Sequence, residues 1–368
     1  MKFRAAILRK VGAPLTVESV ELRPLKPGDV LVKIRASGLC HTDLEVIDGS
    51  LAYPMPIVLG HEGAGVVEHV GAGVTAVAPG DHVVCSWNPH CGHCFYCERD
   101  QPILCEPFTR HQPAGHLLDG ESRYLLDAAK LHHFSVVSSH AEYCVVPESG
   151  AIRVPKAIPF DRACLIGCGV MTGVGAVSRM ARVEAGSSVA VIGCGAVGLN
   201  ALQGALYEQA ATIIAIDRDR SREALASTFG ATHFVLADAV DAIAQVKALT
   251  AGRGVDYVFE CAGAEASLQL GFEVVRPGGQ AVILGKTNVN QKVSLRFGSL
   301  MGEKRIVRSS YGGARPQRDF PWLAQAYLDG KLKLDELISL RLPLARINEG
   351  FDAMRRGEVV RAVIEFPA

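Results

Sequence analysis

The chain has 368 residues, 49% of them hydrophobic, so it can bury a large core and is long enough for two domains. Lys and Arg total 38 and Asp and Glu total 38, and this neutral balance argues against nucleic acid or an anionic membrane surface as a partner. The 11 cysteines come without a secretion signal, which favours metal ligation and free thiols in a cytoplasmic protein. We also expect no membrane span, because no window approaches about 18 apolar residues.

The first 170 residues predict an irregular, β-rich domain. Residues 1–8 form a first strand, and alternating apolar residues at 30–35 predict a half-buried one. Residues 65–71 and 83–84 predict further short strands, and Pro-Gly-Asp turns precede the strands at 30 and 83. Many short strands between such turns favour a small, partly open barrel over βαβ units.

Cys40 and His61 in this region are a thiol and an imidazole, the ligand types that zinc prefers. A catalytic zinc needs three protein ligands and one open position, and Cys168 is the obvious third candidate. Thr42 offers a hydroxyl near the thiolate, and Asp43 could orient the His61 imidazole. A lone cysteine or histidine is more often an ordinary core residue, so the prediction depends on the whole set.

Four more cysteines follow in a short lobe: Cys91, Cys94, Cys97 and Cys105. Four thiolates can close the coordination of one tetrahedral zinc, which predicts a structural site. An iron–sulfur centre is the rival, but the fourth cysteine comes too late for the ferredoxin spacing and is followed by Glu106 instead of proline. Because the thiolates already saturate the metal, we expect His93 at the surface.

Residues 109–139 are polar and weakly patterned, and they predict a long loop that is functional or disordered. His132 and His133 are adjacent there. On a strand they would point to opposite faces and could not share an ion. We expect them to be solvated or at a pocket rim.

The middle of the chain predicts a dinucleotide-binding unit. Residues 188–192 form a fully apolar run typical of a strand buried on both faces. The run continues into a glycine-rich turn, a helix-compatible stretch at 199–209 and a second strand at 212–216. In the turn, Gly193 permits a tight bend, Gly195 lets backbone N–H groups approach a pyrophosphate, and Gly198 lets the helix pack closely on the strand.

Asp217 ends the second of these strands. Its carboxylate can accept hydrogen bonds from the ribose hydroxyls of NAD and would repel the 2′-phosphate of NADP. Three arginines nearby, Arg218, Arg220 and Arg222, could instead host that phosphate. The acid favours NAD.

Further βα alternation predicts a doubly wound parallel sheet. The strands are predicted at 234–236, 257–261 and 279–285, and the helices between them at 239–249 and 264–275. The tail predicts helices at 321–328 and 347–355, then a strand at 362–366 that rejoins the first domain. The expected domains are 1–170 with 311–368, and 171–310.

With these motifs placed, the chain resembles the zinc-dependent medium-chain alcohol dehydrogenases over nearly its whole length. The resemblance lies in residues 38–43 and 60–65, the four-cysteine lobe, residues 167–169, the pair Thr172-Gly173 and residues 193–198. The long segment before Glu142 is similar to that of the liver-type and formaldehyde-oxidising branches. The family implies a GroES-like barrel domain, a Rossmann domain and a homodimer, although a tetramer stays open.

The resemblance also implies a site. Cys40, His61 and Cys168 would hold the catalytic zinc, with Glu62 as an occasional ligand, and the lobe would hold a second, structural zinc. Thr42 would take the substrate hydroxyl proton and Asp43 would hold His61. The implied cofactor contacts are His41, Thr172, Gly193, Gly195, Val197, Gly198, Asp217, Arg222 and Arg361. The implied substrate pocket is lined by Trp87, Phe134 and Ser135.

The implied activity is the reversible oxidation of an alcohol to an aldehyde or ketone by hydride transfer to NAD. Two positions depart from the family pattern. Glu45 replaces the histidine that ends the liver-type proton relay, and Thr109 replaces the arginine that holds the glutathione carboxylate in the formaldehyde-oxidising class. We therefore expect primary alcohols of aromatic or allylic type, with Trp87 in the pocket wall.

Three alternatives stand beside this expectation. One is an S-(hydroxymethyl)thiol or formaldehyde dehydrogenase. Another is a zinc-free reductase of the same superfamily, which the joint presence of Cys40, His61 and Cys168 disfavours. The third is a non-enzymatic nucleotide sensor.

Overall fold

The structure is a computed structural model that describes residues 1–287 and 290–367. The chain divides into two compact units. Unit 1 comprises Met1–Cys168, Arg315–Gly330 and Leu334–Ala368, and unit 2 comprises Gly169–Ala314 and Lys331–Lys333.

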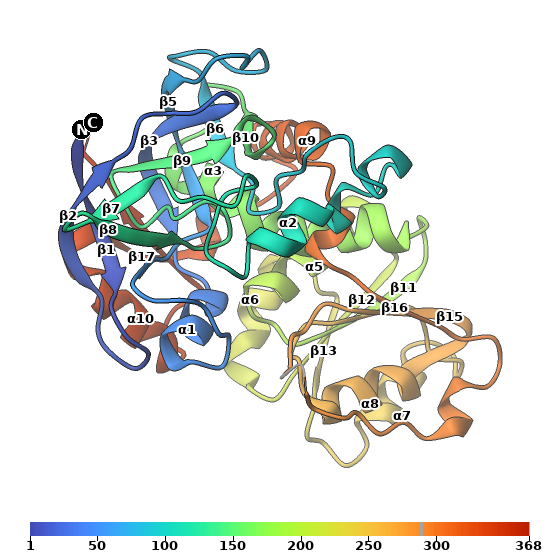
Figure 1. The fold of residues 1–368 in the computed structure, drawn as a ribbon. Helices are drawn as coiled ribbons and strands as arrows, with labels where there is room; N and C mark the ends of the chain where they lie inside the picture. The colour runs from blue at the N-terminus through green and yellow to red at the C-terminus, as the bar shows by residue number, and fades with distance from the viewer. Residues whose placement is uncertain (288–289, 368) are drawn as a thin grey trace. The chain divides into compact units, whose positions relative to one another are not determined.

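Unit 1 is built from a barrel and a second sheet (Figure 1). The barrel closes in the order β1 (Lys2–Leu8), β2 (Thr16–Leu22), β7 (Tyr124–Leu126), β8 (Ala129–His133) and β4 (Ile57–Val58). The second sheet has the order β10 (Ala151–Arg153), β6 (His82–Cys85), β5 (Glu62–Val70), β3 (Asp29–Gly38), β18 (Arg361–Glu365) and β17 (Ile338–Pro343), and β9 (Tyr143–Pro147) pairs with β3. The predicted β-rich barrel domain is confirmed, and its barrel is closed rather than partly open.

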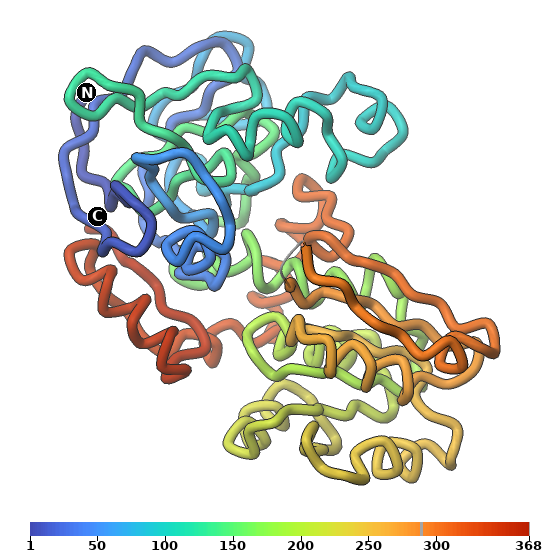
Figure 2. The backbone as a smooth tube through the Cα atoms, turned by 60° about the horizontal axis from the view of Figure 1, so that its bottom comes forward, coloured from blue at the N-terminus to red at the C-terminus, as the bar shows by residue number. Residues whose placement is uncertain are grey.

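The helices of unit 1 are α1 (His41–Asp48), α2 (Glu106–His111), α3 (Phe160–Leu165), α9 (Pro316–Leu328) and α10 (Ile347–Arg355). The C-terminal strand β18 runs antiparallel to β3, with Val363 opposite Gly38. Figure 2 shows this return, in which the red end of the chain lies beside its blue beginning. As the sequence predicts, the last strand rejoins the domain formed by the first part of the chain.

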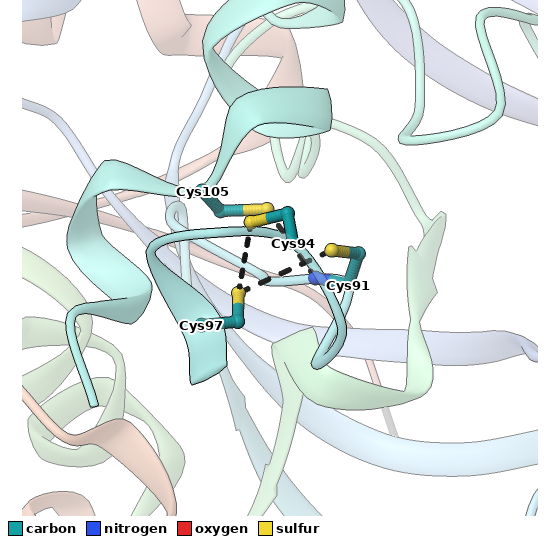
Figure 3. Close-up of side chains that lie close together, drawn as sticks. All are labelled: Cys91, Cys94, Cys97 and Cys105. Carbon is teal, nitrogen blue, oxygen red and sulfur yellow. Dashed lines mark hydrogen bonds between the residues drawn. The ribbon is translucent and has the colours of Figure 1, made fainter. Parts of the chain in front are cut away.

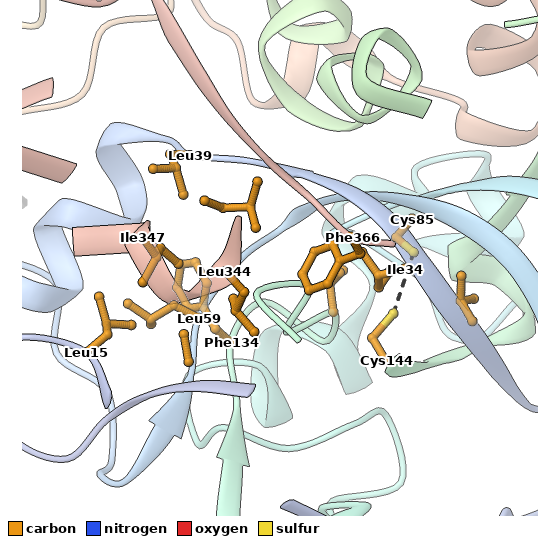
Figure 4. Packing of buried hydrophobic residues seen from close by; sticks show 14 of the residues in the cluster. Leu15, Ile34, Leu39, Leu59, Cys85, Phe134, Cys144, Leu344, Ile347 and Phe366 are labelled. Atoms are coloured by element: carbon orange, nitrogen blue, oxygen red, sulfur yellow. Dashed lines mark hydrogen bonds between the residues drawn. The ribbon is translucent and has the colours of Figure 1, made fainter. Parts of the chain in front are cut away.

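The hydrophobic core of unit 1 lies next to the candidate metal ligands Cys40 and His61. Val30, Val32 and Ile34 alternate along β3 and are almost fully buried in one cluster, while Leu31 on the other face is buried in a second cluster. Leu39, next to Cys40, and Phe134 belong to the first of these clusters (Figure 4). Burial of each such side chain stabilises the fold by about 1.5–3 kcal/mol.

The prediction of a long loop at residues 109–139 is wrong. This segment contains the second half of α2 and the barrel strands β7 and β8. Some of its polar residues are buried and paired: Arg123 is 3% exposed and its Nε donates to Asp29 at 2.6 Å. His133 is fully buried, stacks on Tyr124 and accepts a hydrogen bond from the Arg123 N–H. The expectation of a solvated or pocket-rim His133 is therefore also wrong. The ion pair of Arg123, and the hydrogen bond and ring stacking of His133, offset the free-energy cost of burying these polar side chains.

Unit 2 contains a parallel sheet in the order β13 (His233–Leu236), β12 (Thr212–Asp217), β11 (Ser188–Ile192), β14 (Val255–Glu260), β15 (Val275–Ile283) and β16 (Arg305–Arg308). Its helices are α4 (Met171–Gly175), α5 (Ala196–Tyr207), α6 (Glu223–Thr228), α7 (Ala242–Ala248) and α8 (Glu265–Val274). The strand order reverses beside β11, which is the switch point where doubly wound sheets bind ligands. The predicted doubly wound sheet is confirmed.

One helical run, Phe160–Ala181, is long and apolar enough to cross a membrane by length and composition alone. Its apolar window is 72% buried inside the protein, as in the core helix of a globular domain. Two stretches of this run, Ile166–Val170 and Ala176–Ala181, have π-helical geometry.

Candidate metal and cofactor sites

Two groups of potential metal ligands occur among the residues that the structure describes. The first contains Cys40, His61, Glu62 and Cys168, whose ligand atoms all lie within 4.8 Å of one another. Cys40 precedes α1, and Cys168 lies in the π-helical turn of Ile166–Val170. His61 immediately precedes β5, which begins at Glu62. Such π-turns are common at functional sites because they alter the direction of side chains on an otherwise regular helix.

Asp43 ties two of these ligand segments together. It is fully buried, and its Oδ2 accepts the Cys40 N–H at 3.1 Å, which caps the start of α1. Its Oδ1 accepts the Gly60 N–H at 3.0 Å. His61 Nδ1 lies 3.5 Å from Asp43 Oδ2, which leaves Nε2 free to face the other ligands. The structure thus brings Asp43 to His61 as the sequence suggests.

The electrostatics of this group fit a cation. A hydrogen bond from Cys168, followed by the charges of Arg361 and His61, lowers the pKa of Cys40 well below its ordinary value, which favours the thiolate. Burial raises the pKa of Glu62 to about 7, although Arg361 Nη2 lies only 3.2 Å from its Oε1. Two sulfurs, an imidazole and a carboxylate form a donor set suited to zinc, whose catalytic sites keep three protein ligands and one open position.

The second group is the four-cysteine lobe (Figure 3). Sγ of Cys97 lies 3.5 Å from that of Cys94 and 4.0 Å from that of Cys91, and the cysteines are free thiols. A tetrahedral zinc with bonds of about 2.3 Å separates its sulfurs by about 3.8 Å, so one ion fits between them. An iron–sulfur cluster needs several iron and sulfide atoms inside the sulfur cage, and this spacing is too small for them. His93 is exposed, as expected.

Aromatic side chains lie directly beside the first group. Phe134 is fully buried and its ring meets that of His61 edge-on, with centroids 5.5 Å apart. Tyr53 packs edge-on against Phe134 at 5.0 Å, and its hydroxyl interacts with Ser135 and Gln112. Tyr53 and Gln112 are not predicted from the sequence, because no local pattern reveals that Tyr53 packs on Phe134 beside His61 or that Gln112 contacts the Tyr53 hydroxyl.

The third expected pocket residue, Trp87, is half-buried and faces a different neighbour. It packs against Phe108, with ring centroids 6.3 Å apart, and against the core clusters of unit 1. Phe108 belongs to α2, which follows the cysteine lobe.

The N-terminal turn of α1 holds the residues expected to meet substrate and cofactor. Thr42 Oγ1 lies 3.8 Å from Cys40 Sγ, and His41 beside it is exposed. Glu45 follows about one turn later and is half-buried. Arg361 is 4% exposed, and besides its contact with Glu62 it donates from Nη1 to the Leu39 carbonyl at 3.4 Å.

In unit 2 the glycine-rich turn has the expected geometry. Gly193 has φ +92°, and a Cβ added at Gly198 would lie 1.8 Å from the Gly193 carbonyl oxygen, so only glycine lets α5 start so close to β11. A Cβ added at Gly195 would meet no protein atom, which leaves space beside the α5 N-terminus for a phosphate group.

The remaining expected cofactor residues surround this turn. Asp217 accepts the Cys194 N–H at 2.6 Å and the Asp219 N–H at 3.0 Å, so its carboxylate is fixed at the end of β12. Arg222 lies 3.8 Å from Asp219 and is partly exposed. Val197 is in the first turn of α5, and Thr172 is on α4, where Gly173 packs against α5.

Two family models match the chain. The Alcohol dehydrogenase GroES-like domain matches residues 26–156, and the Zinc-binding dehydrogenase model matches residues 196–329. Among curated relatives, "Alcohol dehydrogenase class-3" of Cereibacter sphaeroides is 38% identical, with all of both chains covered. "S-(hydroxymethyl)glutathione dehydrogenase" of Paracoccus denitrificans is also 38% identical, over 99% of this chain and 100% of the relative.

Solved structures give the same fold. Benzyl alcohol dehydrogenase from Acinetobacter calcoaceticus is 32% identical, has a TM-score of 0.94 and is covered completely, as is this chain. A zinc-binding dehydrogenase from Sinorhizobium meliloti bound to NADP is 27% identical, with a TM-score of 0.79 and complete coverage of both chains.

Proposed function

The chain belongs to the zinc-binding medium-chain alcohol dehydrogenases, and on that premise we propose that it catalyses the reversible oxidation of a primary alcohol to an aldehyde with NAD as hydride acceptor. The observation that carries the proposal is the gathering of Cys40, His61 and Cys168 from three separate segments into one buried group. A structural zinc site is closed by four protein ligands, whereas three ligands with a hydroxyl such as that of Thr42 nearby fit a catalytic site with one open position.

The roles of the residues follow from their positions. Cys40, His61 and Cys168 hold the catalytic zinc, and the four cysteines of the lobe hold the structural zinc. When bound, the catalytic zinc supplies Lewis-acid polarisation of the substrate oxygen. Thr42, with its hydroxyl 3.8 Å from Cys40 Sγ, takes the proton of the substrate hydroxyl. Asp43 fixes the ring of His61, and Glu62 forms an ion pair with Arg361.

We assign NAD as the cofactor because Asp217 ends β12 with a fixed carboxylate that can accept hydrogen bonds from both ribose hydroxyls. The NADP-bound relative from Sinorhizobium meliloti and the nearby Arg222 support the rival choice. Initial rates with NAD and with NADP at equal concentrations separate the two. A higher kcat/KM with NADP would refute this assignment.

For the substrate, the names of the curated relatives favour an S-(hydroxymethyl)thiol adduct over the aromatic or allylic alcohol expected from the sequence. We therefore propose S-(hydroxymethyl)glutathione as the first candidate. Against it stands Thr109, whose hydroxyl donates to the Cys105 carbonyl at 3.0 Å and which provides no positive charge for a glutathione carboxylate. Arg110 is adjacent and exposed, and it is the nearest guanidinium in sequence that can take that role.

An aromatic primary alcohol is the second candidate, and two observations support it. The solved benzyl alcohol dehydrogenase has a TM-score of 0.94 to this chain. The edge-to-face series of Tyr53, Phe134 and His61 gives the metal group an aromatic border, in which the half-buried Tyr53 offers a face for a benzyl ring and the buried Phe134 supports Tyr53 from behind.

One substrate panel decides between the candidates. We would measure kcat/KM with NAD for S-(hydroxymethyl)glutathione, benzyl alcohol, geraniol and ethanol. Values highest for the glutathione adduct support the first candidate, and values highest for benzyl alcohol or geraniol support the second. A clear preference for ethanol would contradict both.

The cytoplasm, where free thiols persist, is the proposed location.

A further inference from the structure

A buried polar cluster lies next to Asp43, near the carboxylate oxygen Oδ1, whereas His61 is near Oδ2. We call Ser37, Ser139 and His140 the His140 cluster; all three residues are 0% exposed. Ser37 Oγ lies 2.7 Å from Ser139 Oγ and 2.9 Å from His140 Nδ1. His140 Nε2 has no hydrogen-bond partner among the described residues, and it lies 3.8 Å from Asp43 Oδ1.

The backbone fixes His140 against the segment that carries the metal ligands. The His140 N–H donates to the Leu59 carbonyl at 3.0 Å, and the Ser139 N–H donates to the Gly60 carbonyl at 2.9 Å. Gly60 has φ +93°, and a Cβ there would lie 2.5 Å from the His140 nitrogen and 2.6 Å from its Nδ1. Only glycine therefore allows His140 to approach so closely. Phe351 closes the other side with an edge-on ring contact at 5.9 Å.

The hydrogen bonds permit one arrangement in which every donor points toward the carboxylate. The Ser139 hydroxyl donates to Ser37, and the Ser37 hydroxyl donates to His140 Nδ1. The imidazole then carries its proton on Nε2, facing Asp43. Burial lowers the pKa of His140 to about 4, so the ring is neutral at physiological pH. At 3.8 Å the pair is an electrostatic contact rather than a hydrogen bond.

We propose that His140 is a positioning residue for the catalytic zinc: the Nε2–H of its neutral ring stabilises the Asp43 carboxylate, which in turn holds His61. The inference rests on the proposed function, because it assumes that Cys40, His61 and Cys168 hold zinc. Partners behind metal-bound histidines commonly change metal affinity by about 10–100-fold when removed. His140 lies one shell further out, so we expect about tenfold.

The test measures the affinity of both zinc ions by competition with a chromophoric chelator, a readout independent of turnover. His140→Phe keeps an aromatic ring but removes both nitrogens, and His140→Gln restores a donor of similar reach. His133→Phe is the matched control, because His133 is equally buried but contacts the Arg123 N–H instead of Asp43. A Cys168→Ser variant identifies which zinc is the catalytic one.

We expect His140→Phe to lower the affinity for the catalytic zinc about tenfold and to leave the affinity for the structural zinc unchanged. His140→Gln should recover most of the loss, and His133→Phe should leave both affinities unchanged. Equal losses in His140→Phe and His133→Phe, loss of both zincs together, or no loss at all would overturn the inference.

Should His140→Phe fail to fold, Ser37→Ala removes only the hydroxyl that fixes the tautomer. It should lower the affinity for the catalytic zinc by a few-fold, and an unchanged affinity would overturn the inference. A wild-type chain that binds only one zinc would overturn the proposed function together with this inference. Two zincs with unaltered affinity in the variants would overturn this inference alone.

Discussion

Phe134 joins the hydrophobic core to the candidate catalytic group, because its buried ring contacts both His61 and Tyr53. An edge-to-face aromatic pair contributes about 0.5–1.5 kcal/mol beyond its burial. If a substrate ring uses the same border, Phe134→Leu should lower the ratio of kcat/KM for benzyl alcohol to that for ethanol by about 2–10-fold.

The control for this change is Phe320→Leu, another fully buried phenylalanine of unit 1 that lies on α9. It should lower the unfolding temperature similarly but leave the benzyl-to-ethanol ratio unchanged. If both variants change the ratio equally, or neither does, the aromatic border has no part in substrate selection.

At this scale the ligands are predictable and their surroundings are not. Cys40, His61 and Cys168 stand out because zinc selects sulfur and imidazole donors, a chemical constraint visible in residue type. His140 and Tyr53 carry no such signal. His140 reaches Asp43 because its segment bonds to Leu59 and Gly60, and Tyr53 lies near His61 because it packs on Phe134. These contacts join residues far apart in the chain, so no local sequence pattern predicts them.

At the scale of elements, β8 depends on a neutral, buried histidine. Burial, with the charge of Arg123 adding to it, lowers the pKa of His133 to about 3. An unfolded histidine titrates near pH 6.5, so between pH 6.5 and 3 the unfolded chain binds the extra proton. The contribution of His133 to stability is therefore complete above about pH 6.5 and is lost as the pH falls towards 3.

Between pH 6.5 and 5 this loss is about 2 kcal/mol. His133→Phe should be less stable than wild type at pH 7, because it leaves the Arg123 N–H unpaired, but its stability should fall less on acidification. Urea unfolding midpoints of wild type and variant, measured at pH 7 and at pH 5, test this. Parallel losses in the two proteins would show that His133 is not the group responsible.

The regular elements follow from the sequence where apolar residues are continuous or alternate. Strand β11 occupies the predicted residues 188–192, and α10 the predicted residues 347–355. The prediction fails where tertiary pairing decides. Strands β7 and β8 pair with each other, and Arg123 just before β7 forms a buried ion pair with Asp29 of β3. Helix α9 begins at Pro316, five residues before the predicted start, with Pro321 inside it. Proline reads as a helix boundary, but at the first helical position its missing N–H costs nothing.

The cysteine lobe has little core of its own, so we expect the structural zinc to hold it together. Cys97→Ser removes one of four ligands and should release about one zinc per chain, because closed structural sites contribute folding free energy directly. Limited proteolysis should then cleave between residues 91 and 105 in the variant and not in wild type. Resistance equal to that of wild type would contradict this role.

At the scale of the whole molecule, the edge strand β16 suggests how two chains associate. Large apolar side chains are exposed along and just before it: Phe297 is 76% exposed, Met301 60% and Ile306 39%. Exposed apolar edges of this kind commonly mark association surfaces. We propose a homodimer through this edge.

Phe297→Asp with Met301→Asp should convert the dimer to a monomer in light scattering. Val240→Asp is the control, because Val240 is a fully exposed apolar residue of unit 2 away from β16. A wild-type mass of one chain, or a dimer that survives the double change, would contradict the proposal.

The most direct test of the central claim measures bound zinc and alcohol-dependent NADH formation together, in the wild-type chain and in Cys168→Ser. We predict two zincs and turnover in wild type, and one zinc, no measurable turnover and retained NAD binding in the variant, because the glycine-rich turn and Asp217, which we propose to bind NAD, lie in unit 2, and Cys168 lies in unit 1. Turnover that persists in Cys168→Ser, or a wild-type chain that reduces NAD with none of the panel alcohols, would contradict the account.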